Sequence, residues 1–386
     1  MIDVLVLMMH PLPLLLFLSL EIVTGANTSL REAGIEAGIY MGSQFKLSAI
    51  QNISDPEYRT KHESQYSLST VGNMCKWQAT HPQQGLFDLS RCIASFNYSL
   101  TANQQFRGHN LCWGNNNPSW LLNGSFKKDE LQTILQHHIN TVMKGVVSAG
   151  KSPFAWDVVN EACVTQEEYD SNGGLSGNAN FFKDNFWYPA LPNYVDVAFT
   201  AARKANPNTL LFYNDYGQNA LNGKAEVVFN MVKSMVDRGI PIDGVGMQQH
   251  VSLEDIQDVN NWEKTLHQNI ARLVDLGLVV HITEFDVKCA DPCDQSDLQK
   301  QASIYAGAVR ACLANKPTIA GAAGCQSFES WGFTDKYSWL NGKRCKPFYF
   351  GPCHALPFDE KYQPKPAVAS MLQVLQNDSS KTMLRI

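Results

Sequence analysis

The sequence predicts an α/β protein folded as a single (β/α)8 TIM barrel. Eight short apolar runs, many of them β-branched, recur along the 386 residues, and amphipathic helical patterns separate them. No linker rich in Pro, Gly or Ser divides the chain. Strands that alternate with helices indicate a parallel sheet, and eight such strands can close into a barrel. We therefore expect one domain over residues 27–386.

Each predicted strand is a short apolar run bounded by polar or turn-forming residues. The strands are Phe45–Ile50, Leu68–Cys75, Gln105–Trp113, Phe154–Asn160, Thr209–Asn214, Gly244–His250, Leu278–Glu284 and Ile319–Glu329. The helices have apolar residues three and four positions apart, which is typical of a helix with one buried face. The clearest are Leu30–Met41, Leu131–Val147, Tyr194–Ala205, Lys224–Arg238, Trp262–Leu276 and Leu298–Ala314.

The N-terminal segment and the cysteines predict a secreted glycoprotein. Residues 1–26 combine apolar stretches with small residues near Ala26, which is typical of a cleaved signal peptide. Ten cysteines suit an oxidising compartment, and acceptor sequons for N-glycans occur at Asn27, Asn52, Asn97, Asn123 and Asn377. Spacing suggests the disulfides Cys289–Cys293, Cys312–Cys325 and Cys345–Cys353, although sequence alone leaves the connectivity open. Cys112 and Cys163 are expected in a disulfide or as buried thiols.

Composition restricts the partners. The net charge is −5 and the pI is about 6.1, so the chain has no basic field for nucleic acid. After the signal, no segment is apolar enough to span a bilayer. Neither C-x-x-C nor H-E-x-x-H occurs, which argues against zinc. We expect a monomer without metal or cofactor that acts on a neutral or weakly charged substrate.

Polar and aromatic side chains gather where the predicted strands end. In a (β/α)8 barrel these ends form one face, which carries the active site. Amides and charged groups can bind sugar hydroxyls while aromatic rings stack on sugar rings, so the set indicates a carbohydrate ligand. Its members are Asn73, Lys76, His109, Trp113, Asn160, Glu161, Asn214, Asp215, Tyr216, Gln248, His250, Glu284, Asp286 and Trp331.

Two of these residues form a candidate catalytic pair. FAWDVVNEA places Glu161 after one apolar strand, and LVVHITE places Glu284 at the end of another. A single glutamate at a strand end is more often simply solvated. Two carboxylates across a sugar site, however, are the machinery of glycoside hydrolysis, in which one protonates the leaving oxygen and the other attacks the anomeric carbon or activates water.

Several motifs, in order, resemble glycoside hydrolase family ten, the retaining endo-β-1,4-xylanases, over about residues 36–376. WDVVNEA resembles the segment with the acid/base, and HITEFDV resembles the segment with the nucleophile. The resemblance implies that Glu161 is the general acid/base, that Glu284 is the nucleophile, and that Asn160 binds the sugar 2-hydroxyl. It also implies that His250 and Asp286 keep Glu284 ionised and aligned.

Further motifs imply the residues that bind substrate. They are NMCKW at 73–77, RGHNLCW at 107–113, NDY at 214–216, GMQQH at 246–250 and the tryptophans after the last strand. The implied sugar-binding residues are Asn73, Lys76, His109, Trp113, Asn160, Tyr216, Gln248, Trp331 and Trp339. The expected activity is therefore secreted, endo-acting, retaining hydrolysis of β-1,4-xylan.

The sequence departs from the family pattern at three positions near the sugar site. Gly72, Gly114 and Asn116 stand where the family usually has Glu, His and Gln. One interpretation is a wider cleft that also accepts β-1,4-glucan, and we favour it because the catalytic set is intact. The alternative is weakened sugar binding, which at its extreme gives a catalytically weak or inactive carbohydrate-binding barrel.

Overall fold

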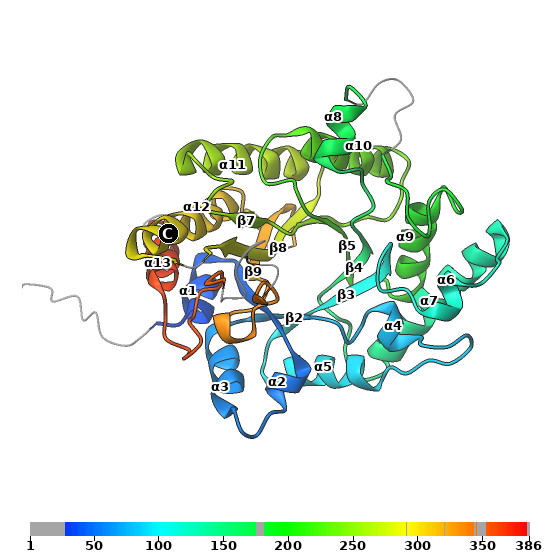
Figure 1. Cartoon of the computed structure of the whole chain (residues 1–386), viewed down its shortest axis with the longest axis horizontal. Coiled ribbons are helices and arrows are strands. Elements are labelled where there is room, and N and C mark those ends of the chain that lie inside the picture. The colour runs from blue at the N-terminus through cyan, green and yellow to red at the C-terminus, as the bar shows by residue number, and fades with distance from the viewer. Residues whose placement is uncertain are drawn as a thin grey trace, which may run out of the picture.

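The computed structural model describes residues 28–174, 181–290, 292–319, 321–342, 345 and 353–383. The predicted signal peptide and the sequon at Asn27 lie outside these residues. Figure 1 shows the strands at the centre of the molecule with helices around them.

The strands form a closed parallel barrel, as predicted. They are β1 (Tyr40–Phe45), β2 (Leu68–Val71), β3 (Gln105–Trp113), β4 (Ala155–Asn160), β5 (Leu210–Asp215), β6 (Gly244–Met247), β7 (His250–Ser252), β8 (Val279–Lys288) and β9 (Gly324–Ser330). The sheet order runs β6-β5-β4-β3-β2-β1-β9-β8, and β6 also pairs with β8, which closes the ring. The short β7 pairs with the far end of β8.

The helices pack their apolar faces on this barrel. They are α1 (Leu30–Ala37), α2 (Leu47–Ile50), α3 (Pro56–Gln65), α4 (Trp77–Thr80), α5 (Ser90–Thr101), α6 (Ser119–Leu122), α7 (Lys128–Val147), α8 (Gln166–Ser171), α9 (Tyr194–Ala205), α10 (Gly223–Asp237), α11 (Val259–Asp275), α12 (Gln295–Leu313) and α13 (Pro366–Met383). In α11, for example, Trp262, Leu266, Ile270 and Leu273 are buried on one face. Among the described helices, none has the length and hydropathy of a membrane span.

Two predicted boundaries near the N-terminus are wrong. The first strand is Tyr40–Phe45, and the apolar run after it is the short helix α2, so Phe45–Ile50 is not a strand. The first helix ends at Ala37 rather than Met41, because Gly38 adopts a left-handed conformation with φ 84° and caps it. A short apolar run fits a strand and a buried helix equally well, which explains why the run that forms α2 was predicted to be a strand.

Other strand boundaries shift. The predicted strand Leu68–Cys75 ends at Val71, and Ile319–Glu329 begins only at Gly324. The predicted strand Gly244–His250 is interrupted, because Gln249 has φ 59° and separates β6 from β7. This break turns His250 into the start of a separate strand at the mouth of the barrel.

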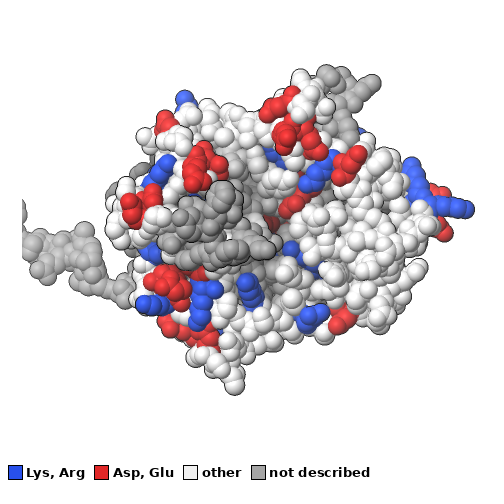
Figure 2. Space-filling model, viewed as in Figure 1, with Lys and Arg blue, Asp and Glu red and all other residues white. Residues whose placement is uncertain are grey.

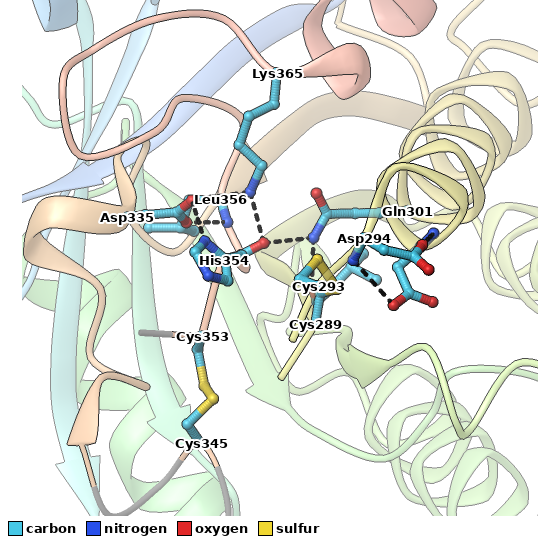
Figure 3. The surroundings of a disulfide bond; sticks show 12 residues. Cys289, Cys293, Asp294, Gln301, Asp335, Cys345, Cys353, His354, Leu356 and Lys365 are labelled. Atoms are coloured by element: carbon cyan, nitrogen blue, oxygen red, sulfur yellow. Dashed lines mark hydrogen bonds and ion pairs between the residues drawn. A yellow bond between two sulfur atoms is a disulfide. The ribbon is translucent and has the colours of Figure 1, made fainter. Parts of the chain in front are cut away.

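All three suggested disulfides form, and a fourth joins Cys75 to Cys92. Cys112 and Cys163 are buried free thiols. Figure 3 shows Cys289–Cys293 and Cys345–Cys353 close together, and the amide of Cys289 donates to the carbonyl of Cys353 at 3.1 Å.

The segment around these two disulfides is also tied to neighbouring elements. Lys365 Nζ and Gln301 Nε2 both donate to the carbonyl of His354, each at 2.6 Å. These bonds hold the segment that follows Trp339 against α12 and against Lys365, which precedes α13.

Candidate active site

The predicted site residues converge on one cleft of about 1140 Å³ at the C-terminal ends of the strands. Figure 2 shows a hollow at the centre of this face, with acidic and basic side chains around it. The predicted residues that line the cleft are Asn73, Lys76, His109, Trp113, Asn160, Glu161, Tyr216, Gln248, His250, Glu284, Trp331 and Trp339. Asp286 does not line the cleft and lies behind His250 instead.

Glu161 is held by its backbone and by three donors. It follows β4 with a left-handed φ of 55°, and its amide donates to the carbonyl of Asn214 at 2.9 Å. A non-glycine residue in this region costs on the order of 1 kcal/mol and is characteristic of functional sites. Trp113 Nε1 donates to Oε2 at 3.0 Å, and the amides of Asn160 and Gln248 donate to Oε1, each at 3.1 Å.

The surroundings of Glu161 favour its protonated form. Burial raises the pKa of this carboxyl group, and the negative charges of Asp215 and Glu284 raise it further. The hydrogen bond from Gln248 opposes the shift without reversing it. A raised pKa keeps this carboxyl group protonated to higher pH, as a general acid requires.

Glu284 has the opposite tendency. It lies on β8, is 4% exposed, and accepts hydrogen bonds from Asn214 Nδ2 at 2.8 Å and from His250 Nε2 at 3.2 Å. Burial alone would raise its pKa. The hydrogen bond from His250 and the fields of the His109 and His250 imidazoles outweigh burial, so the pKa of Glu284 lies below its usual value. The carboxylate therefore stays ionised, as a nucleophile requires.

A chain of hydrogen bonds orients His250 toward Glu284. His250 Nδ1 donates to Asp286 Oδ2 at 2.8 Å, and Trp339 Nε1 donates to the same oxygen at 2.8 Å. Burial lowers the pKa of His250, but the two carboxylates dominate and raise it to about 10. The imidazole is thus charged at neutral pH and donates from both nitrogens. The structure places His250 and Asp286 together as predicted.

Beneath the cleft, a buried ion pair that the sequence did not reveal supports His109. His109 Nδ1 donates to Asp157 Oδ2 at 2.8 Å, and the same carboxylate pairs with the fully buried guanidinium of Arg107. The Trp331 ring packs edge-on against the His109 ring with centroids 5.2 Å apart. Arg107 and Asp157 point into the barrel from β3 and β4, and their sequence positions alone do not show that the two side chains meet.

Asn214 contacts the residues around both glutamates and Asp215 acts on Glu161, although neither was assigned a specific role from the sequence. Asn214 Nδ2 donates to both Glu284 Oε1 and Asn160 Oδ1, each at 2.8 Å. Asp215 is fully buried, pairs with Lys224 Nζ at 2.9 Å and helps raise the pKa of Glu161. Their position in the motif NDY at the end of β5 was the available signal.

Cations and aromatic rings complete the cleft. The Lys76 ammonium lies over the Trp113 ring at 4.9 Å from its centroid. Burial lowers the pKa of Lys76, while the charges of Glu284 and Glu161 act against that shift. Tyr216 lies under two ammonium groups, those of Lys183 at 5.1 Å and Lys224 at 5.0 Å. Of these two lysines, neither lines the cleft.

The three departures from the family pattern have different surroundings. Gly72 and Asn116 line the cleft, whereas Gly114 does not, and a Cβ at Gly114 would lie 3.0 Å from Asn185 Cβ. Beside Gly72, a Cβ would lie only 2.3 Å from Gln44 Nε2. The volume that the missing side chain leaves at position 72 is therefore not empty.

A (β/α)8 barrel whose cleft holds two carboxyl groups with opposite pKa shifts has the arrangement that glycoside hydrolysis uses. The family model for glycosyl hydrolase family 10 matches residues 29–374. The chain belongs to this family, as its motifs suggested.

Curated relatives and solved structures of this family are similar over nearly the whole chain. Endo-1,4-beta-xylanase B of Thermotoga neapolitana is 31% identical over 95% of this chain and 98% of its own length. Endo-1,4-beta-xylanase of Agaricus bisporus is 30% identical over 92% of this chain and 96% of its own. The structure of xylanase 10B from Thermotoga petrophila, in complex with xylobiose, is 29% identical with a TM-score of 0.79, covering 92% of this chain and 99% of that one.

Proposed function

We propose that this protein is a secreted endo-1,4-β-xylanase that cleaves β-1,4-xylan with retention of configuration. The carrying observation is that one cleft holds two glutamates whose pKa values shift in opposite directions, that of Glu161 up and that of Glu284 down. A site of this kind can supply a proton donor and an ionised nucleophile at the same pH. The xylan specificity rests on the family relatives, which are named endo-1,4-beta-xylanases.

The first chemical step uses both glutamates. A carboxylate oxygen of Glu284 attacks the anomeric carbon while the bond from that carbon to the bridging oxygen breaks. Glu161 gives its proton to the bridging oxygen, so the shortened chain leaves as an alcohol. The product on the protein is an ester between the sugar and Glu284. His250 and Asn214 hold the attacking carboxylate in place through their hydrogen bonds to it.

The second step restores the enzyme. Once Glu284 is esterified it carries no negative charge, so one of the causes that raise the pKa of Glu161 disappears. The ionised Glu161 then takes a proton from water, whose oxygen attacks the anomeric carbon and releases Glu284 as a carboxylate. The second attack occurs from the face opposite the ester, and the two inversions give net retention.

The surroundings of Gly72 bear on whether the cleft accepts β-1,4-glucan in addition to xylan. The additional β-1,4-glucanase activity was predicted from the missing side chains at Gly72, Gly114 and Asn116, and at the first of these positions Gln44 Nε2 occupies the space that a Cβ would take. We therefore propose that β-1,4-glucan is at most a weak substrate of the natural sequence.

We also propose that the protein is exported and glycosylated. The sequon residues Asn52, Asn97, Asn123 and Asn377 are all exposed, and four disulfides join eight of the ten cysteines. Disulfides persist in oxidising compartments. Expression of the full chain in a eukaryotic cell should give a medium fraction whose gel mobility increases after treatment with an N-glycosidase. Retention of unglycosylated protein inside the cell would contradict this proposal.

One assay separates the enzyme from the alternative of an idle carbohydrate-binding barrel. Reducing ends are measured with soluble xylan and with carboxymethyl-cellulose, using the wild type and Glu284→Gln. We expect the wild type to cut xylan rapidly and the variant to be inactive but still folded. If the wild type cuts neither polymer, the protein is not the proposed hydrolase. If it cuts carboxymethyl-cellulose faster than xylan, xylan is not its main substrate.

The stereochemistry is read separately. Proton NMR of the first products distinguishes β from α anomers before they interconvert. Retention requires that the β-anomer appears first. If the α-anomer appears first, water attacks directly and Glu284 acts as a base instead of a nucleophile.

A further inference from the structure

The side chain of Gln44 fills the space that Gly72 leaves open. Gln44 lies near the end of β1, is 8% exposed and lines the active-site cleft. A Cβ placed on Gly72 would lie 2.3 Å from Gln44 Nε2, a separation that real Cβ atoms do not adopt. Positions 44 and 72 therefore share one volume, and in this chain the side chain at position 44 occupies it.

The Gln44 amide has a fixed orientation. Its Nε2 donates to the carbonyl of Phe45 at 2.7 Å, and β1 is hydrogen-bonded to β2 on one side and to β9 on the other. Gly332, which follows β9, lies near the other end of the amide, since a Cβ on it would lie 3.9 Å from Gln44 Oε1. Within the described residues Oε1 accepts no hydrogen bond. An ordered amide with a free acceptor at the edge of a cleft is suited to bind a hydroxyl group.

We propose that Gln44 is a specificity-determining residue that narrows the cleft beside Asn73 and favours xylose over glucose units. The proposal rests on the proposed function and identifies which residue sets its substrate. Glucose carries a hydroxymethyl group that xylose lacks, so a side chain that narrows the cleft disfavours glucose units more than xylose units. The free Oε1 in addition accepts a hydrogen bond from a hydroxyl group of the bound sugar.

Removal of the Gln44 side chain tests whether this residue favours xylose over glucose units. Gln44→Ala and the wild type are compared by kcat/KM on an aryl β-xylobioside and an aryl β-cellobioside. We expect the cellobioside-to-xylobioside ratio to rise about tenfold, the scale at which one small group in a pocket is discriminated. The matched control is Gln105→Ala, since Gln105 is exposed at the start of β3 and does not line the cleft. The control should leave the ratio unchanged.

The shared volume is tested by a double-mutant cycle. Gly72→Ala introduces a Cβ that displaces the Gln44 amide, so kcat/KM on the xylobioside should fall several-fold. In the double variant Gln44→Ala/Gly72→Ala the added methyl group has room, and the loss caused by the alanine at position 72 should largely disappear. This non-additivity is the signature of two positions in contact.

The outcomes separate the two proposals. If the wild type cuts the xylobioside but Gln44→Ala leaves the ratio unchanged with an unaltered Tm, Gln44 does not set specificity. Additive effects in the cycle would likewise overturn the shared volume. If Gln44→Ala is poorly folded, the single variant Gly72→Ala still tests the proposal because Gln44 is present in it, and an unchanged kcat/KM on the xylobioside would overturn the shared volume. A wild type that cuts neither bioside contradicts the proposed function itself.

Discussion

Glu161 and Glu284 are the same residue type and share one cleft, yet the charges around them shift their pKa values in opposite directions. Around Glu161 the buried charges with the largest influence are carboxylates, Asp215 and Glu284 itself. Around Glu284 the strongest influences opposing burial come from the imidazoles of His250 and His109. Both side chains are largely buried, so desolvation acts on both in the same direction. The difference shows that the neighbours of each glutamate, more than its burial, assign its chemistry.

The largest expected effect comes from changing the glutamates themselves. Glu284→Gln removes the nucleophile and should lower kcat about 10⁴-fold or more on every substrate. Glu161→Gln removes the acid/base and should cost about 10²–10⁴-fold on xylan. On an aryl β-xylobioside with an acidic phenol as leaving group, the first step needs little protonation, so Glu161→Gln should retain a burst of phenol release. Equal losses for both variants on this substrate would contradict the division of tasks.

The next effect comes from the imidazole beside Glu284. His250→Asn removes a charge and a donor that keep the pKa of Glu284 low, so that pKa should rise. Activity depends on ionised Glu284 and is lost as the pH falls through its pKa. The acid limb of the kcat/KM profile should therefore move to higher pH by about one unit. If the acid limb stays in place and only the maximum activity falls, His250 has a structural role and does not control the pKa of Glu284.

A smaller shift is expected on the alkaline limb. Asp215→Asn removes a negative charge that raises the pKa of Glu161, and it leaves the ammonium of Lys224 without its partner. Both changes lower the pKa of Glu161. Activity depends on protonated Glu161 and is lost as the pH rises through its pKa, so the alkaline limb should move to lower pH, by up to about one unit. The double variant Asp215→Asn/Lys224→Met should recover part of the shift. A move toward higher pH would contradict the account.

The smallest effect concerns Trp339. Trp339→Phe removes the hydrogen bond to Asp286 but keeps an aromatic ring, so kcat should fall only a few-fold, consistent with about 1 kcal/mol for one hydrogen bond. Trp120→Phe is the matched control, because Trp120 Nε1 donates to the carbonyl of His81 away from the cleft. Equal losses for both variants would show that Trp339 acts through stability alone.

Much of the barrel and most of its polar face could be predicted from the sequence. Strands such as Gln105–Trp113 end in polar residues at the active-site face, and a regular barrel brings those ends together. The exchange at Phe45–Ile50 could not be avoided, because four apolar-rich residues fit either element. The boundary between β6 and β7 depends on the backbone angle of Gln249, and the hydrophobic periodicity of the sequence carries no signal for such an angle.

Contacts between strands were beyond the reach of the sequence. The ion pair of Arg107 with Asp157 joins neighbouring strands inside the barrel. In a sequence, a charged residue within an apolar run can equally mean that the strand ends there, so such a pair is not predictable from the sequence. The filling of the space at Gly72 by Gln44 joins β1 to the loop after β2. A glycine read on its own suggests a gap, and only the neighbouring strand shows whether the gap exists.

The central claim is that Glu284 forms a covalent bond to the sugar while Glu161 handles the proton. The most direct measurement is mass spectrometry of the protein after reaction with a 2-deoxy-2-fluoro-β-xylobioside carrying an activated leaving group, since the fluorine slows the second step more than the first. We predict a stable adduct of one xylobiosyl unit, located by peptide mapping on Glu284 and absent from Glu284→Gln. An adduct on another residue, or none while xylan is still cleaved, would contradict the mechanism.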